Sequence, residues 1–437
     1  MAINPQGGEA AVQRRRFLSL TAAGAATTAM ASTLAACGGE TSGSGDVTLK
    51  LVAADYGDKP ENNSKKYWLK VARAFTSKYP DIKIDITVLP WIDIDRKLAK
   101  MVKDGQAPDL AQIGAYADFA AAGKLYSADQ LLSIPTQSDF ISSISAAGDL
   151  HRVQYGLPFV ASTRLLFYNE DLFSKAGVTK APESWDDLQA AAVKLKAAGV
   201  KIPFGLPFGR EEPQAETMMW MLGGGGNYTD RTGAYTIDSP ENVKAFEWLR
   251  DELVGKGLTG PGDPSRTNRQ QVFDAFTHGD VGMLNGHPTL MKQAAARDIK
   301  YGMAPLPGIE GKAESTMGVA DWMMGFKTHG RREQIGRFLD FVYHKDNVLD
   351  FTSRYAMLPV TTSASEAMRH DEAEKKLWPF LDQLQQAQFY PADKTSWARV
   401  TTLLKEKIGS TVKKGGDPAS VLQELQREAE ATDNADG

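Results

Sequence analysis

The side chain best suited to covalent chemistry is a single thiol, because Cys37 is the only cysteine among 437 residues. Three arginines, Arg14–Arg16, precede an uncharged run of small and apolar residues from Phe17 to Ala36. A basic segment, an apolar segment and small residues before a cleavage point are typical of a secretory signal. We therefore predict that residues 1–36 form a signal peptide. A membrane span is the alternative, but Ala, Thr and Ser dominate the run rather than Leu and Ile.

The residues around Cys37 predict that its sulfur carries a lipid. Leu34-Ala35-Ala36 before the cysteine resembles the lipobox of bacterial lipoproteins, whose thiol takes the lipid after cleavage. The linker 37–46 is rich in Gly and Ser, which disfavours the alternative of a buried free cysteine. Arg14-Arg15 with Phe17-Leu18 resembles a twin-arginine export motif, and a plain basic signal looks similar, so export by either the Tat or the Sec route fits. We expect a lipoprotein on the extracellular face of the cell membrane.

Composition excludes several classes of protein. Without residues 1–36 the chain keeps 401 residues and a net charge of −6, which is a size that favours two lobes over one core. A mildly acidic chain without a Lys/Arg block is poorly suited to a phosphate backbone, so we expect no nucleic-acid partner. The six histidines lack metal-ligand spacing, and one cysteine makes no cysteine-based site. The sequence therefore predicts no metal and no cofactor.

Strand and helix patterns alternate along the first part of the chain. Val47–Val52 and Ile82–Leu89 predict strands, the second with isoleucine at alternate positions, and Tyr67–Tyr79 predicts a helix between them. Asp95–Asp104 predicts a further helix, and Ala107–Ile113 a short buried strand. This alternation indicates an α/β lobe with a mostly parallel sheet.

A second α/β lobe is predicted to begin near Leu157. Its expected elements are strands at Leu165–Tyr168, Ile202–Leu206 and Val281–Leu284, and helices at Trp185–Ala198, Thr217–Leu222, Ser239–Val254 and Gln270–Phe276. Ser239 and Pro240 open their helix in the positions that a cap and a first-turn proline prefer.

Seven short motifs follow one another in an order that is typical of one family. They are Ala107-Pro108-Asp109-Leu110, Tyr155-Gly156-Leu157-Pro158-Phe159, Phe167-Tyr168-Asn169, Ser184-Trp185-Asp186-Asp187-Leu188, Gly279-Asp280-Val281-Gly282-Met283, Tyr301–Pro307 and Leu358-Pro359-Val360. Over nearly all of residues 47–430 the chain resembles the extracellular solute-binding proteins of family 1, the maltose-binding-like receptors of ABC importers.

The resemblance implies an α/β, two-lobed periplasmic-binding-protein fold of type II, hinged by three crossovers, with the ligand between the lobes. It places lobe 1 at 47–160 and 318–360, and lobe 2 at 161–317 and 361–437. The lobes would hinge at the crossovers as they close. These crossovers are expected near Phe159–Arg164, Met317–Met324 and Leu358–Thr362.

The resemblance also implies sugar contacts on the first lobe. Aromatic faces stack on the C–H faces of a sugar ring, and planar polar groups bind its hydroxyls. The loops after the first three strands offer three pairs: Asp58 and Lys59, Trp91 and Asp93, and Tyr116 and Asp118. They leave the carboxyl ends of the strands, where an open α/β sheet binds ligands. A solvated turn is the alternative for the first pair.

Further contacts are implied on the second lobe and the crossovers. Glu212 matches the Glu of a Glu-Pro-aromatic element, although Gln214 replaces the aromatic residue. His287 departs from the stacking Trp of an Asn-Gly-Pro-Trp element, which implies a ligand other than maltose. The remaining candidates are Ser162, Asp321 and Trp322 on the crossovers and Trp397 at the start of the penultimate helix, with core packing as the alternative for both tryptophans.

The family is not enzymatic, so the resemblance implies a monomeric receptor that captures a carbohydrate, a di- or oligosaccharide. Lobe closure and delivery to the permease of an ABC importer would follow. A polyamine, glycerol phosphate or a peptide is the alternative ligand. A secreted glycoside hydrolase is the alternative class, but it needs a pair of catalytic carboxylates, and no recognisable catalytic motif occurs.

Overall fold

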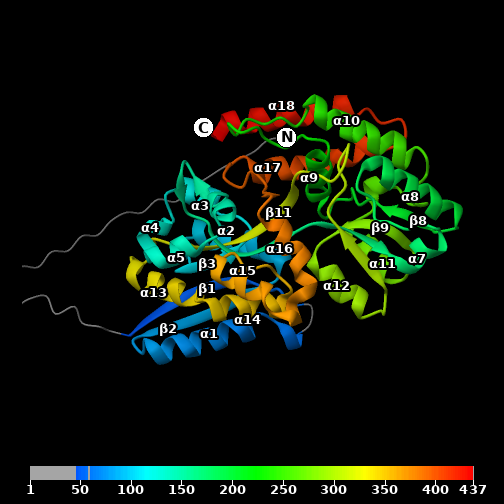
Figure 1. Ribbon diagram of the computed structural model, residues 1–437. Coiled ribbons are helices and arrows are strands. Elements are labelled where there is room, and N and C mark those ends of the chain that lie inside the picture. The colour runs from blue at the N-terminus through cyan, green and yellow to red at the C-terminus, as the bar shows by residue number, and fades with distance from the viewer. Residues whose placement is uncertain (1–45, 58–59, 437) are drawn as a thin grey trace, which may run out of the picture. The chain divides into compact units, whose positions relative to one another are not determined.

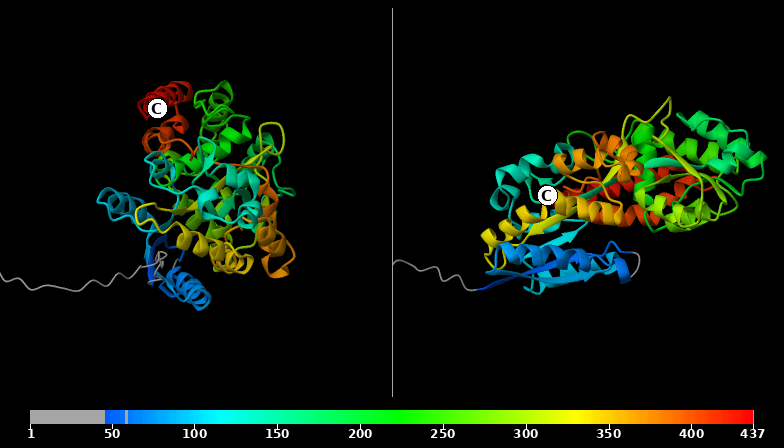
Figure 2. Two further views of the ribbon diagram at one scale, coloured as in Figure 1. Left: turned by 90° about the vertical axis from the view of Figure 1, so that its left-hand side faces the viewer. Right: turned by 60° about the horizontal axis from the view of Figure 1, so that its bottom comes forward.

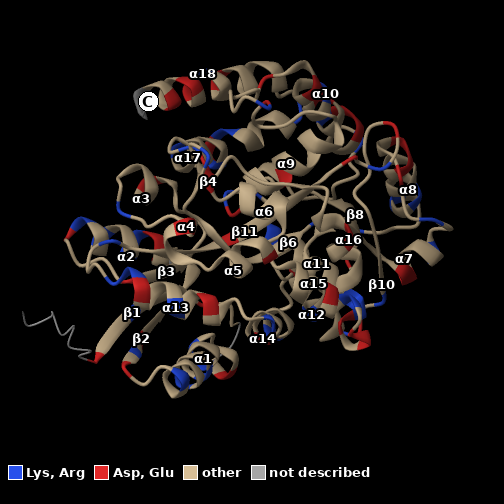
Figure 3. Ribbon diagram, turned by 60° about the vertical axis from the view of Figure 1, so that its left-hand side comes forward, with Lys and Arg blue, Asp and Glu red and all other residues tan. Residues whose placement is uncertain are grey.

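The computed structural model describes residues 46–57 and 60–436. The predicted signal peptide, Cys37, most of the linker and the Asp58-Lys59 pair lie outside the described residues. In the described part, no helix combines the length and the apolar composition that crossing a bilayer requires. Lys and Arg alternate with Asp and Glu over the outer helices in the view of Figure 3.

The first sheet follows the order β12-β11-β3-β1-β2, and β6 pairs with the free side of β11. β1 is parallel to β2 and β3, whereas β11 is antiparallel to β3 and β6. The predicted mostly parallel sheet is thus found around β1, and the antiparallel pairs come from later chain passages. Its strands are β1 (Val47–Ala54), β2 (Ile82–Leu89), β3 (Leu110–Ile113), β6 (Leu157–Thr163), β11 (Thr316–Gly325) and β12 (Ala387–Gln388).

The second sheet has the order β10-β7-β9-β8, with β8 and β9 parallel and the other pairs antiparallel. Its strands are β7 (Leu165–Asn169), β8 (Ile202–Gly205), β9 (Val281–Gly286) and β10 (Tyr301–Ala304). β4 (Asp149–Leu150) and β5 (Val153–Gln154) form a separate hairpin.

Helices cover both sheets through apolar faces. α1 (Lys65–Lys78) buries Trp68, Val71, Ala72 and Phe75 at helical spacing, packs on β2, and lies beside it in Figures 1 and 2. α8 packs on β8, and a capping box of Ser184 with Asp187 opens it. The other helices packed near the sheets are α2 (Trp91–Lys103), α7 (Glu170–Lys175), α8 (Trp185–Ala197), α11 (Arg269–Thr277), α12 (Pro288–Ala295), α13 (Arg332–Val342), α14 (Lys345–Tyr355) and α16 (Trp378–Leu384).

A third group of helices packs together: α17 contacts α9 and α18, α18 contacts α10, and α9 also contacts β11 of the first sheet. α10 continues as a π-helical turn at Leu249–Val254, within the helix predicted to end at Val254. The members are α9 (Pro213–Gly223), α10 (Pro240–Trp248), α17 (Trp397–Lys407) and α18 (Pro418–Asp436). Short helices complete the chain: α3 (Ala117–Ala121), α4 (Ala128–Leu131), α5 (Ile134–Asp139), α6 (Ser142–Ala146) and α15 (Thr362–Arg369).

The three segments predicted as crossovers meet at one residue. Ala161 of β6 faces Ala320 of β11 in the antiparallel ladder. On its other side it forms a bridge with Leu358, with N–O distances of 3.0 and 2.8 Å. All three passages therefore run side by side, two of them as strands of the first sheet. The domain boundaries drawn through them stay a prediction.

Candidate ligand-binding site

A cavity of about 790 Å³ lies between the first sheet and the helices α2, α9 and α17. Its lining comes from α2, the loop after β3, the middle of β11, the start of α9 and the first turns of α17. It includes seven of the twelve residues predicted as ligand contacts: Trp91, Tyr116, Asp118, Glu212, Asp321, Trp322 and Trp397. The cavity therefore gathers residues that are up to about 300 positions apart in the sequence.

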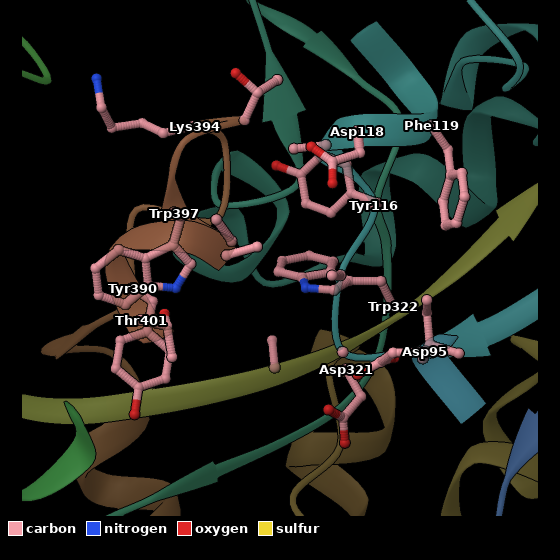
Figure 4. A pocket seen from close by; sticks show the side chains of 18 of the residues that line it. Asp95, Tyr116, Asp118, Phe119, Asp321, Trp322, Tyr390, Lys394, Trp397 and Thr401 are labelled. Atoms are coloured by element: carbon pink, nitrogen blue, oxygen red, sulfur yellow. The ribbon is translucent and has the colours of Figure 1, made fainter. Parts of the chain in front are cut away.

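Aromatic rings stand on opposite sides of this cavity (Figure 4). Tyr116 meets Trp322 edge to face, with ring centroids 5.2 Å apart. Across the cavity, Trp397 packs on Tyr390 with centroids 5.3 Å apart. Trp91 is 37% exposed and lies at the rim, which is unusual for so large an apolar ring in water. Tyr116 and Trp322 are only 0% and 2% exposed, so on the first wall the accessible ring is that of Trp91, and on the second wall Tyr390 and Trp397 are partly exposed.

Helix α2 places one acid at the cavity and turns another away. The helix begins at Trp91, four residues earlier than predicted, so Trp91, Asp95 and Ala99 share the face that lines the cavity. Asp93 lies on a different face, where it accepts hydrogen bonds from Arg96 and Lys97. Asp95 is therefore a further candidate from this helix, and the contact of Asp93 with a ligand stays a prediction. Spacing of four residues from Trp91 was the sequence signal that pointed to Asp95.

Helix α17 repeats this arrangement on the opposite wall. Trp397, Thr401 and Lys405 follow one another at four-residue spacing and all line the cavity. From the sequence we named Trp397 but not Thr401 or Lys405. The four-residue spacing from Trp397 along the helix is the signal that could have found them. Tyr390 was also missed, because it precedes the helix in a loop without a periodic pattern.

Asp321 is the most constrained acid of the site. Its Oδ2 accepts a hydrogen bond of 2.6 Å from the hydroxyl of Tyr56. Burial raises its pKa to about 6, and the bond from Tyr56 opposes that rise. A register shift follows Asp321, because Trp322 pairs with Pro158 and Phe159 is skipped. Such a bulge alters the direction of neighbouring side chains, and both Asp321 and Trp322 line the cavity.

A buried cluster of charges stands behind Glu212. Arg269 Nε lies 2.8 Å from one oxygen of Glu212, and Arg164 lies 3.6 Å from the other. Arg269 also pairs with Glu211 at 2.7 Å. Arg164 is only 4% exposed, so its charge requires such a partner. Both arginines near this wall are therefore neutralised by glutamates.

His287 and Ser162 belong to the cluster behind the wall and do not line the main cavity. Arg269 Nη1 lies 3.0 Å from His287 Nε2, and since arginine only donates, Nε2 accepts. Nδ1 then carries the proton and donates to Thr289 at 2.8 Å. Burial, with the charges of Arg164 and Arg269, keeps the pKa of His287 well below its usual range. His287 is thus a neutral, partly buried histidine, and the hydroxyl of Ser162 accepts from Arg164. The roles of both residues as ligand contacts stay predictions.

Glu216 is a further buried acid that sequence reasoning did not single out. Its Oε1 accepts from Trp220 Nε1 at 2.8 Å and from Asn285 Nδ2 at 3.0 Å. Burial raises its pKa to about 8, although both hydrogen bonds oppose the rise. Glu216 is therefore largely protonated at neutral pH. Trp220, its partner, is 3% exposed and packs in the core rather than in the cavity.

Among residues 46–57 and 60–436 no group of three or more His, Cys, Asp or Glu side chains is arranged to hold a metal ion.

The sequence matches known families and proteins. The model of the bacterial extracellular solute-binding proteins matches residues 59–348. A binding protein of Brucella abortus (strain 2308) is 30% identical over 393 residues, covering 88% of this chain and 92% of the relative. The sn-glycerol-3-phosphate-binding periplasmic protein UgpB of Shigella dysenteriae is 26% identical over 330 residues, covering 68% of this chain and 72% of that protein.

Solved structures share the fold. The maltose-bound MalE3 of Thermotoga maritima matches with a TM-score of 0.71 at 20% identity, over 88% of this chain and 99% of that one. The cyclic α-maltosyl-1,6-maltose binding protein of Arthrobacter globiformis matches with a TM-score of 0.75 at 18% identity, over 89% and 99%. The predicted two-lobed fold is confirmed by these matches. With the fold, the family model and the relatives in agreement, the chain belongs to the bacterial extracellular solute-binding proteins.

Proposed function

We propose that this protein is the receptor of an ABC importer that captures a neutral carbohydrate, a di- or oligosaccharide, in the cavity between Trp322 and Trp397. The observation that carries the proposal is the combination of aromatic rings on two opposing walls with buried polar atoms that lack a partner. Stacking rings alone would suit many flat ligands. The polar atoms narrow the choice to a ligand that is rich in hydroxyl groups.

The partnerless polar atoms are Gln214 Oε1 and the hydroxyl of Tyr390. Both residues line the cavity, and neither atom has a hydrogen-bond partner within the described part of the chain. A buried polar atom without a partner destabilises a protein by about 1–3 kcal/mol. Both atoms are shielded from solvent in the structure, so a ligand hydroxyl, which both donates and accepts, would bond to them only after the two side chains turn toward the cavity. Gln214 stands where relatives are expected to stack an aromatic ring, so the contact here would be polar.

The charge of the lining favours a neutral ligand. Four acids (Asp95, Asp118, Glu212 and Asp321) and three lysines (Lys103, Lys394 and Lys405) line the cavity. Lys394 pairs with Asp433 at 2.7 Å, and the two arginines behind Glu212 are paired as described. A glycerol phosphate receptor would hold its phosphate with cations that are free to bind it. No ion pair is found for Lys103 or Lys405 in the described part of the chain, so the preference rests on the balance of charge. Four acids against three lysines favour a sugar over the phosphate ester, although relatives include UgpB.

The rest of the molecule supports a receptor that closes and docks. The three chain passages that meet at Ala161 would act as the hinge on which the lobes close around the ligand. The closed monomer would then deliver its ligand to the transmembrane subunits of the importer. Cys37, with its lipid, and the linker after it would keep the receptor at the extracellular face of the membrane, since lipoproteins with more than one acyl chain are retained.

A ligand panel tests the proposal. The melting temperature of the purified protein would be measured with mono-, di- and oligosaccharides, sn-glycerol-3-phosphate and polyamines. A ligand at a hundred times its dissociation constant adds about 2.7 kcal/mol to stability. We expect a di- or oligosaccharide to raise the melting temperature. Stabilisation by glycerol phosphate or a polyamine alone would overturn the sugar assignment, and turnover of a glycoside would overturn the receptor assignment.

A further inference from the structure

Asp321 is the last of three side chains, after Gln112 and Tyr56, that are joined by hydrogen bonds starting in the first sheet. The backbone N–H of Ala54 donates to Gln112 Oε1 at 3.1 Å, which fixes the orientation of the amide. Gln112 Nε2 then donates to the hydroxyl of Tyr56 at 2.8 Å, and that hydroxyl donates to Asp321 Oδ2 at 2.6 Å. Gln112 is fully buried. In this series each donor, from the N–H of Ala54 to the hydroxyl of Tyr56, bonds to one acceptor. The direction of each of the three hydrogen bonds is therefore determined.

The ring of Tyr56 cannot turn away from Asp321. It meets Trp91 edge to face at 5.4 Å and Phe351 edge to face at 5.0 Å, and it contacts Tyr355 at 5.9 Å. Tyr56 thus joins the end of β1 to the rim of the cavity and to α14. Its hydroxyl is fixed by packing before any ligand arrives, which is the condition for a preorganised site.

The second oxygen of Asp321 lies at the cavity. Asp321 lines it, and a Cβ atom built on Gly114 would lie 3.8 Å both from Asp321 Oδ1 and from the ring of Trp91. Gly114 therefore leaves open the space in which a carboxylate oxygen and an aromatic ring stand side by side. This is the pair of groups that a sugar requires, one for a hydroxyl and one for the C–H face.

We propose that Tyr56, supported by Gln112, is a positioning residue that engages Oδ2 of Asp321 and directs Oδ1 toward a ligand hydroxyl. The inference rests on the proposed function for the nature of the ligand. Neither Tyr56 nor Gln112 is among the residues that line the cavity. The hydroxyl of Tyr56 and the amide of Gln112 would act on affinity through Asp321, whereas the ring of Tyr56, which Tyr56→Phe keeps, also packs on Trp91.

The pKa of Asp321 reports whether the hydroxyl of Tyr56 donates to it, and this pKa can be measured. The groups that bear on its charge are Tyr56 by hydrogen bond and Asp95 of α2 and Glu212 before α9 by repulsion. Tyr56 favours the ionised carboxylate, because it donates to it. Removal of the hydroxyl should therefore raise the pKa of Asp321 above about 6.

The first test needs no ligand. The unfolding free energies of the wild type and of Asp321→Asn would be measured from pH 4 to 9, and their difference gives the contribution of Asp321. The same difference would be measured between Tyr56→Phe and the double variant Tyr56→Phe/Asp321→Asn. Since the folded pKa is raised, the contribution of Asp321 falls as pH rises from its unfolded pKa through its folded pKa. In Tyr56→Phe we expect the pH at which the contribution of Asp321 stops falling to rise by about one unit. An unchanged curve would overturn the positioning role.

The second test uses the sugar that stabilises the wild type. Tyr56→Phe should weaken its binding about tenfold, because one oriented hydrogen bond is worth about that factor. In an Asp321→Asn background the same change should have little further effect, as expected of two residues that act as one unit. Tyr355→Phe is the control, since its hydroxyl donates to the carbonyl of Asn62 at 3.0 Å and leaves Asp321 untouched.

The outcomes separate this inference from the proposed function. If the wild type binds no saccharide, the proposed ligand is wrong, and the ligand-free titration still decides the role of Tyr56. If the wild type binds a saccharide and Tyr56→Phe binds it equally well, or if the two changes are additive, the positioning role is wrong and the receptor assignment is unaffected.

Discussion

Tyr116 and Trp322 meet edge to face over a glycine, with an interplanar angle of 68°. The hydroxyl of Tyr116 donates to the carbonyls of Ala147 and Asp149, so its ring is held from behind. A Cβ atom on Gly156 would lie 2.6 Å from Tyr116 Cδ1 and 3.0 Å from Trp322 Cε3. The first wall of the cavity is therefore built on the absence of a side chain at Gly156.

Gly156→Ala should lower the unfolding free energy by about 1–3 kcal/mol and weaken ligand binding, because both rings must shift to admit a methyl group. Urea denaturation and the ligand dissociation constant measure the two effects. Gly311→Ala is the control, since a Cβ atom there meets nothing within 4 Å. Equal stability of Gly156→Ala and the wild type would show that the rings are not packed on this glycine.

Trp397→Ala should weaken saccharide binding by about 2 kcal/mol, roughly thirtyfold in the dissociation constant, since it removes a stacking ring from the second wall. Isothermal titration calorimetry measures this change. Trp397→Phe, which keeps an aromatic ring, should weaken saccharide binding less than Trp397→Ala. Trp378→Ala is a matched control, because Trp378 donates to the carbonyl of Met368 and does not line the cavity. Similar losses for the two alanine variants would argue against stacking at Trp397.

Glu216 should make the protein less stable at alkaline pH. Its folded pKa of about 8 exceeds the unfolded value of about 4.5, so the folded state binds the proton more tightly. Its contribution is complete below pH 4.5 and is lost as pH rises toward 8. Chemical denaturation at several pH values should show that Glu216→Gln, a neutral substitute, reduces this decline. The exposed Glu310→Gln should leave the decline as it is, and an equal slope in Glu216→Gln would contradict the prediction.

Cys37→Ala should abolish lipid attachment and leave saccharide affinity unchanged, because the residues that line the cavity begin at Trp91. Incorporation of labelled palmitate and the partition between membrane and soluble fractions measure the first effect. A variant that still incorporates palmitate would show that the lipid is attached elsewhere.

Much of the secondary structure was predictable from local pattern. Ile82–Leu89 is a strand with the predicted bounds, since alternate apolar residues match the two faces of a sheet. The start of the next helix was predicted less well: Trp91 and Asp93 were expected in a loop, and the helix begins at Trp91 instead of Asp95. Asp93 and Asp95 therefore lie on different faces of one helix, since two positions along a helix turn a side chain to another face.

The sequence by itself determined the family, the two-lobed fold and most of the aromatic residues at the cavity, because these follow from order and local composition. Only the tertiary structure decided which polar residues line the cavity and which form hydrogen bonds and ion pairs with one another. The pKa of His287 is lowered by burial and by the charges of Arg164 and Arg269, and Asp321 accepts a hydrogen bond from Tyr56, which lies 265 positions away in the sequence. Burial and charge pairing depend on neighbours in space, and no local pattern records them.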